Sequence, residues 1–235
     1  MMENRLVAQR AGLRTPKAAA IAGLLFAAML ATIFLLLRSA LPADAREPGA
    51  WLAQDLTRVE IAVNLMPFAA IAFLWFIGFL RDRLGRHEDR FFSTMFFGSG
   101  LLFLGMLFTL AALTGGILVA HSVQPQVMVD SATFHVARAA IHSIANIYIT
   151  KMAAVFMFAT SKVTFHTGIA PRWLTFAGYG LSLALLFGSH FVAWSFIVFP
   201  FWMLLLSGWM LMNERSSERE APVRHAEGSG SRGAG

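Results

Sequence analysis

The sequence is short of the residues on which most catalytic and metal sites depend. It has no cysteine, which excludes disulfide bridges and thiolate metal sites. Only 14% of its residues are charged while 57% are hydrophobic, which excludes an ordinary soluble domain. No Asp or Glu lies inside any of the long apolar stretches, and the sequence contains no HExxH-like metal motif and no Gly-rich phosphate loop. An enzyme is therefore the least favoured class, because the apolar part of the chain offers no acidic base or thiol nucleophile.

Six apolar stretches fill most of the chain. A hydrocarbon core of about 30 Å needs roughly 20 helical residues per crossing, and continuous apolar runs favour helices over an alternating β-barrel pattern. The predicted crossings are residues 18–37, 61–80, 95–119, 136–160, 173–190 and 194–212. The predicted fold class is all-α, an integral membrane bundle of six transmembrane helices over residues 18–213. A basic tail over residues 1–17 precedes the bundle, and a disordered tail over residues 214–235 follows it.

The basic residues between the crossings alternate from side to side. Fourteen lie in the two tails and the even-numbered connections, against three in the odd-numbered connections, namely Arg38, Arg46 and Arg58. This bias predicts that both termini are cytoplasmic. It also accounts for the net charge of +6 without a nucleic-acid partner. A signal peptide cleaved near Ala43-Asp44-Ala45 is the competing interpretation, but the apolar run before it is too long.

Four short motifs between residues 60 and 110 carry a resemblance. They are Met66-Pro67-Phe68, Arg81-Asp82-Arg83-Leu84-Gly85, Glu88-Asp89-Arg90-Phe91-Phe92 and Gly98-Ser99-Gly100. This stretch is similar to a family of uncharacterised multi-pass membrane proteins from high-GC Gram-positive bacteria. The resemblance implies a bacterial cell membrane, and it brings no activity that could be assigned to a residue.

The fourth predicted crossing carries an unusual polar stripe. At 100° per residue, His135, Arg138, His142 and Asn146 fall within about 80° of one another. A polar stripe facing lipid would be costly, so we expect it to face the bundle or a wet cavity in the outer half of the membrane.

Three interpretations of this stripe compete. His142 with Arg138 could form a proton or anion pathway, and this gives the candidate substrate residues His135, Arg138, His142, Asn146 and Lys151. His121, His142 and His190 close or line helices on the same side and could ligate haem or copper. The simplest alternative is that these histidines lie at the interface and hydrogen-bond lipid headgroups or loop carbonyls.

Lys151 lies near the predicted midplane of the same crossing. A window of residues 141–160 keeps the apolar residues that follow Lys151 in lipid but places this cation in the core, which costs about 2.5–3.5 kcal/mol. No carboxylate in the predicted crossings can pair with it, so the candidate partners are helix-end carbonyls, Asn64, Tyr148, a lipid phosphate, an anionic ligand or another subunit. Snorkelling toward the interface is the favoured interpretation.

The resulting functional prediction is a small membrane protein that moves or senses a small solute, without a resident cofactor. A haem- or metal-binding redox component and a ligand-free interaction subunit are the alternatives. The expected partners are the bilayer, anionic lipid against the basic segment 81–90 at the cytoplasmic face, and a second subunit or further copies of the chain.

Overall fold

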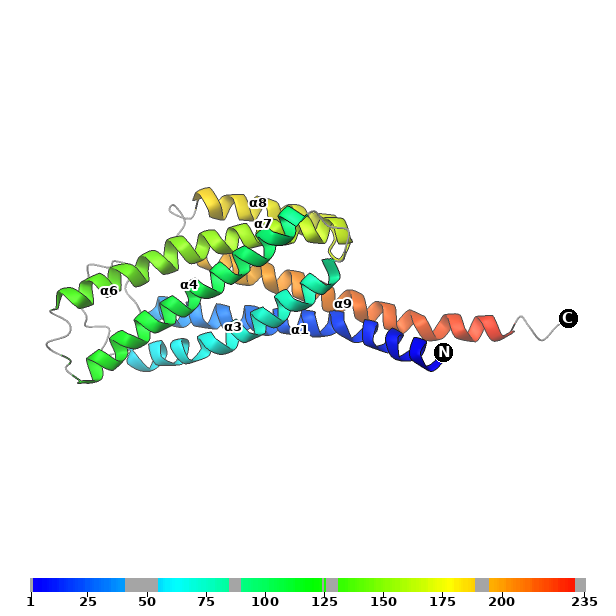
Figure 1. The fold of residues 1–235 in the computed structure, drawn as a ribbon, viewed down its shortest axis with the longest axis horizontal. Coiled ribbons are helices and arrows are strands. Elements are labelled where there is room, and N and C mark those ends of the chain that lie inside the picture. Colours follow the sequence, from blue (N-terminus) through cyan, green and yellow to red (C-terminus); the bar gives the residue numbers. More distant parts are fainter. Residues whose placement is uncertain are drawn as a thin grey trace.

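The structure is a computed structural model that describes residues 2–40, 55–84, 90–123, 125, 131–188 and 195–230, with side chains described over 17–40, 55–81, 91–123, 125, 131–188 and 195–213. The elements of this part of the chain are all helical: α1 (Met2–Ala40), α3 (Leu56–Leu84), α4 (Arg90–Val123), α6 (Ala132–Ser143), the π-helical turn η1 (Ile144–Tyr148), α7 (Ile149–Thr167), α8 (Arg172–Gly188) and α9 (Ser195–Gly230). Because α6, η1 and α7 are continuous, they form one long helical rod, and we use the word rod for this unit and for each of the other helices. The rods run side by side in alternating directions (Figure 1).

Five of the described rods are long and apolar enough to cross a membrane. They are Lys17–Ala40, Leu56–Arg81, Phe91–Val123, Ala132–Thr167 and Ser195–Asn213. The prediction of an all-helical fold with several helices long and apolar enough to cross a membrane is confirmed for the described residues. The remaining rod, α8, is equally apolar but has only 17 residues.

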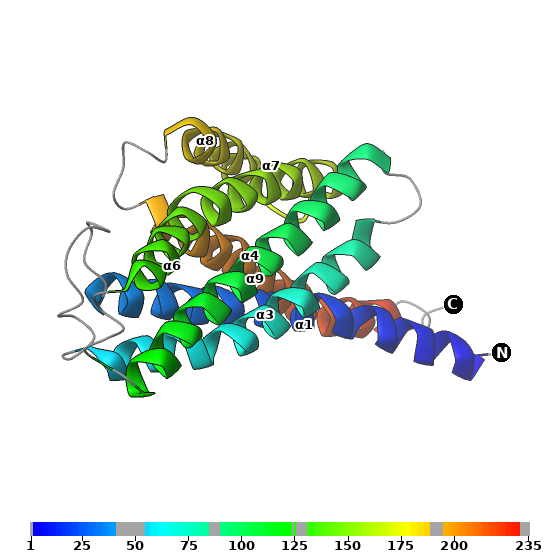
Figure 2. The same cartoon turned by 60° about the vertical axis from the view of Figure 1, so that its left-hand side comes forward.

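The helices begin and end at residues that differ from the predicted limits of the tails. Helix α1 already begins at Met2, and α9 continues to Gly230, where the sequence predicts a disordered tail. Glu, Arg and Ala are frequent in residues 214–227, and these are strong helix formers. The start of α1 and the end of α9 lie at the same end of the bundle (Figure 2). We call this the tail end, and we call the opposite end, where α6 begins, the α6 end.

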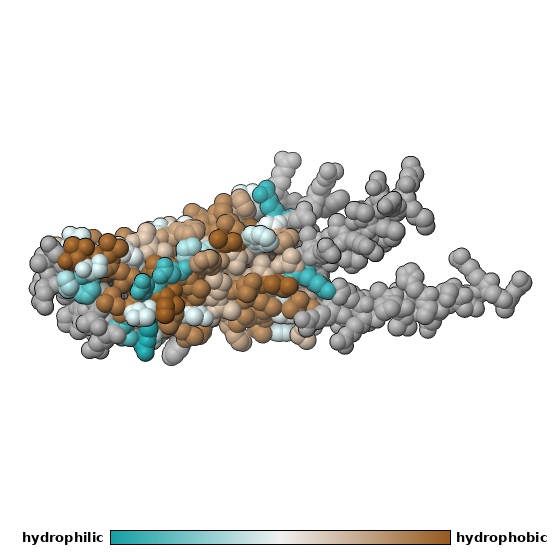
Figure 3. All heavy atoms as spheres, turned by 90° about the horizontal axis from the view of Figure 1, so that it is seen from below, coloured by the Kyte–Doolittle hydropathy of each residue, from teal (hydrophilic) through white to brown (hydrophobic). Residues whose placement is uncertain are grey.

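Each rod packs mainly against two neighbours. Helix α1 packs against α3 and α9. Helix α3 also packs against α4, α4 packs against α7, and α7 packs against α8. Smaller contacts of α9 with α7 and α8 close the ring. On the face shown in Figure 3, apolar residues cover most of the described surface, and hydrophilic residues are more frequent nearer its two ends. Large side chains such as Trp75 and Phe187 are 62% and 75% exposed, as expected for helices that face lipid.

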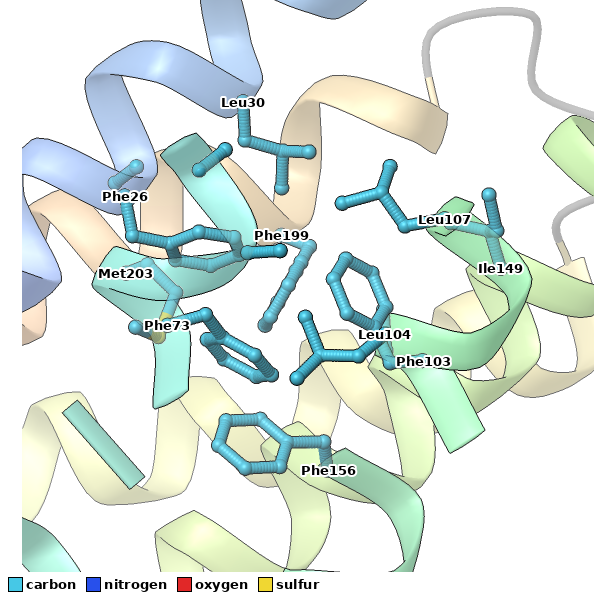
Figure 4. Packing of buried hydrophobic residues seen from close by; sticks show 14 of the residues in the cluster. Phe26, Leu30, Phe73, Phe103, Leu104, Leu107, Ile149, Phe156, Phe199 and Met203 are labelled. Carbon is cyan, nitrogen blue, oxygen red and sulfur yellow. The ribbon is translucent and has the colours of Figure 1, made fainter. Parts of the chain in front are cut away.

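Five phenylalanines close the middle of the bundle. Each comes from a different helix and is at most 3% exposed. They are Phe26 of α1, Phe73 of α3, Phe103 of α4, Phe156 of α7 and Phe199 of α9. Their ring centroids lie 4.3–6.3 Å apart in mostly tilted or edge-to-face pairs (Figure 4). We call this group the phenylalanine cluster. Its rings pack against one another in the interior of the bundle (Figure 4).

Two glycines allow the rods to approach one another closely. A Cβ atom on Gly178 of α8 would collide with Ser161 Oγ of α7 and with the indole nitrogen of Trp202 of α9. A Cβ on Gly23 of α1 would collide with Ser207 of α9. Gly23 therefore lies on a packing face of α1, as small residues in membrane helices commonly do.

The tail end carries two exposed or half-buried cations that lie over aromatic rings. The guanidinium of Arg81 is 4.8 Å from the centroid of Phe97, and Lys162 Nζ is 5.3 Å from that of Phe92. Counting back along the long rod from Lys162 to His142 gives 20 residues, or roughly 30 Å at 1.5 Å per residue. His142 therefore lies about one hydrocarbon thickness away from the tail end.

Candidate functional site

The position of Arg138 follows from how α6 begins. The Ser131 hydroxyl caps the helix by accepting a hydrogen bond from the Phe134 amide at 3.1 Å. Phe134, Arg138 and Ile141 then fall on one face, which is buried against the bundle. Arg138 is 5% exposed, so its guanidinium is held within the protein although it lies beyond the 142–162 segment.

The rod changes to π-helical geometry directly after this face. Over Ile144–Tyr148 the hydrogen-bond pattern lengthens by one residue, and the Ile149 amide donates to the Ile144 carbonyl. A π-helical turn leaves carbonyl groups and side chains displaced from the regular ladder and often occurs at functional sites.

Asn146, within this turn, orients His142. Its amide nitrogen donates to the His142 carbonyl at 2.8 Å and lies 3.3 Å from His142 Nδ1. An amide NH₂ group can only donate, so Nδ1 is the acceptor in this contact. The proton of a neutral His142 then resides on Nε2, which is left as a donor to another group.

Arg138, His142 and Asn146 line one cavity at the α6 end. Its volume is about 100 Å³, and the described residues around it are Phe34, Leu37, Arg38, Leu110, Arg138, Ile141, His142, Ala145, Asn146 and Phe196. A single water needs roughly 10–15 Å³ on this measure, so the cavity has room for several water-sized groups. It is smaller than the roughly 300–1,000 Å³ of pockets for drug-sized ligands. We call it the α6 cavity.

Arg38 is a lining residue that the sequence analysis assigned to a connection. It lies in the last turn of α1 and is exposed, and it lines the α6 cavity together with Arg138. The available signal was its position as the first charge after the apolar run 18–37. That signal marks the end of a crossing, but it does not reveal which helix lies opposite.

Of the three histidines named in the haem or metal hypothesis, the structure describes His121 and His142, and only His142 lines the α6 cavity. His135 is exposed beside the Phe134 ring, with centroids 5.7 Å apart, and neither it nor His121 lines the α6 cavity. His190 lies outside the described residues. Within the described ranges, no group of three or more His, Asp or Glu side chains is placed to hold a metal ion.

Lys151 has a partner within the chain. Its Nζ donates to the Leu186 carbonyl at 2.9 Å, which belongs to the last turn of α8. The final carbonyls of a helix have no amide partner within the helix and carry the negative end of its dipole. A helix-end carbonyl was among the predicted partners of Lys151, and this bond is the one the structure contains.

A second, much smaller space lies between the α6 cavity and the phenylalanine cluster. Its volume is about 10 Å³, and it shares Phe34 and Phe196 with the α6 cavity and Phe103 and Phe199 with the cluster. Thr150 and Ser195 also line it. The two spaces are therefore neighbours, and the smaller one lies against rings of the phenylalanine cluster.

Comparisons with protein-family models, with curated proteins and with solved structures found no match to this chain.

Proposed function

We propose that this chain is a membrane protein that binds a small solute in the α6 cavity, from the outer side of the membrane. The observation that carries the proposal is the convergence of Arg138, His142 and Asn146, with Arg38, on one cavity whose other described lining residues are apolar. A few polar groups in an apolar pocket are the usual construction of a small-molecule site.

The proposed topology has six crossings with both ends in the cytoplasm. Helix α8 adds a crossing to the five longer ones and is the fifth in chain order, and its 17 residues span about 25 Å, slightly less than the hydrocarbon core. The bond from Lys151 to the Leu186 carbonyl supports a helix that ends within the apolar layer, because such carbonyls need a partner there. The distribution of basic residues then places the α6 end outside. The proposed location is a bacterial cell membrane, which depends on the sequence resemblance alone.

The proposed action is binding from outside, with passage across the membrane closed in this conformation. The fully buried rings of the phenylalanine cluster lie between the α6 cavity and the tail end. A solute can be sensed in this state, and moving it further requires the cluster to separate.

Because the chain has no cysteine, a single introduced thiol can test this proposal without background. Ala145→Cys places the thiol on the wall of the α6 cavity, and Val136→Cys, at a position that is 70% exposed on α6, is the matched control. A small membrane-impermeant thiol reagent added outside should label both variants. Labelling of Val136→Cys without Ala145→Cys would show that the cavity is closed to the outer solution and would overturn the proposal.

A further inference from the structure

The charged side chains among the described lining residues of the α6 cavity are arginines. Its described lining residues include two guanidinium groups, from Arg38 and Arg138, besides the imidazole of His142 and the amide of Asn146. The other lining residues are Phe, Leu, Ile or Ala. A compact anion in a cavity of about 100 Å³ that both arginines line is attracted to each guanidinium.

The two arginines differ in how firmly they are held. Arg138 is 5% exposed on the packed face of α6, whereas Arg38 is exposed at the end of α1. One guanidinium is thus fixed by its surroundings, and the other is accessible to solvent at the mouth of the same cavity. Guanidinium groups bind carboxylate and phosphate oxygens through paired N–H donors, which an ammonium group does not match.

His142 adds a further donor. Since Nδ1 accepts from Asn146 at 3.3 Å, the neutral imidazole carries its proton on Nε2. The cavity therefore offers N–H donors from α1, from α6 and from the turn between α6 and α7. It accepts a compact group with several acceptor oxygens.

We infer that the occupant of the α6 cavity is a small anionic group, a carboxylate or a phosphate, held between Arg38 and Arg138. The inference rests on the proposed function, because it names the chemical class of the solute bound at the same site. This group can belong to a free anion in the outer solution or to the headgroup of an anionic lipid, since the cavity lies about one hydrocarbon thickness from the tail end.

The test uses the Ala145→Cys protein in nanodiscs of phosphatidylcholine. We compare its labelling rates with two thiosulfonate reagents of similar size, one bearing an anionic sulfonate and one a cationic trimethylammonium group. For each variant we divide the labelling rate with the anionic reagent by the rate with the cationic reagent. Dividing the ratio for Ala145→Cys by the ratio for Val136→Cys then removes the difference in intrinsic reactivity between the two reagents. The inference predicts a normalised preference for the anionic reagent of at least about tenfold, since a charge-assisted contact contributes about 1.5–3 kcal/mol.

Inorganic phosphate and lipid composition then separate the two sources of the anion. If the occupant is a free anion, phosphate slows labelling of Ala145→Cys but not of Val136→Cys. If it is a lipid headgroup, adding phosphatidylglycerol to the nanodisc slows labelling in the absence of phosphate.

Arginine variants identify the residues responsible. Arg38→Gln should remove most of the anion preference, and because Arg38 is exposed this change should leave the fold intact. Arg58→Gln is the matched control, since Arg58 is exposed at the same end of the bundle and pairs with Asp55 at 3.0 Å outside the cavity. Arg138→Lys keeps a buried cation but loses the planar guanidinium with its paired N–H donors. It should therefore weaken the ability of phosphate to slow labelling of Ala145→Cys.

Each outcome gives a decision. Equal rates with both reagents and no protection by phosphate or phosphatidylglycerol would overturn the anion inference while leaving an open solute cavity. An Ala145→Cys protein that reacts with neither reagent would instead overturn the proposed function itself.

Discussion

The α6 end and the middle of the bundle are formed by many of the same helices but are packed in opposite ways. At the α6 end, Arg38, Arg138, His142 and Asn146 surround an open space of about 100 Å³. In the middle, five phenylalanines from five helices fill the interior, and the adjoining space is only about 10 Å³. In the proposed function, the polar cavity at one end binds the solute, and the packed aromatic rings in the middle block its passage.

The contrast has a physical cause. Charged groups near the end of a membrane helix remain within reach of water and headgroups, whereas the same groups at the midplane are costly. Lys151 is the intermediate case, because it lies deeper than His142 and is stabilised by a carbonyl at the end of α8. The comparison predicts that stability depends on the middle of the bundle and ligand binding on the α6 end.

The largest expected effect on stability is in the phenylalanine cluster. Phe73→Ala removes a ring that contacts Phe26, Phe103, Phe156 and Phe199, and we expect a loss of about 3–5 kcal/mol in the free energy of unfolding. Phe68→Ala on the same helix is the control, because Phe68 is 61% exposed. Thermal unfolding of the purified proteins measures both, and equal losses would show that the cluster does not hold the bundle together.

A somewhat smaller effect is expected where α8 packs on α7 and α9. Gly178→Val introduces side-chain atoms into space occupied by Ser161 and Trp202, and overpacking of this kind costs about 1–3 kcal/mol. Gly180→Val is a matched control in the same helix, since nothing lies within 4 Å of a Cβ placed there. The packing would be misplaced if Gly180→Val lowered the unfolding temperature as much as Gly178→Val.

The smallest global effect is expected at Lys151. Lys151→Met removes the donor to the Leu186 carbonyl but also removes a cation from the apolar layer, so these two terms largely offset each other, to within about 1 kcal/mol. The local effect is larger, because the last turn of α8 loses its partner. Hydrogen exchange of amides 185–188 should accelerate by about tenfold, and Lys162→Met should leave them unchanged. Unchanged exchange in Lys151→Met would contradict the role assigned to this bond.

The sequence predicts the helices better than it predicts the cavity. Continuous apolar runs indicate where rods form, and a 100° periodicity correctly places Arg138, His142 and Asn146 on one side of α6 and η1. His135 points in the same direction around the helix, but it lies seven residues before His142, which is roughly 10 Å along the helix axis. It therefore does not line the cavity. Periodicity reports direction around a helix and does not report depth.

Contacts between distant helices are the part that the sequence does not reveal. The approach of Arg38 to the cavity of Arg138 depends on how α1 and α6 are placed, and the bond from Lys151 to Leu186 depends on where α8 ends. The π-helical turn at Ile144–Tyr148 has no residue signature in its sequence IANIY. All three features depend on tertiary packing, which single-helix patterns do not contain.

The most direct test of the account compares thiols at two depths on the same rod. Ala145 lines the α6 cavity, whereas Ala153 is 3% exposed and lines the small space next to the phenylalanine cluster. The account predicts that a membrane-impermeant thiol reagent added outside labels Ala145→Cys readily and Ala153→Cys no faster than the cysteine-free protein. Comparable labelling at both positions would mean that the cavity continues past the phenylalanine rings, and it would contradict the separation of binding from passage.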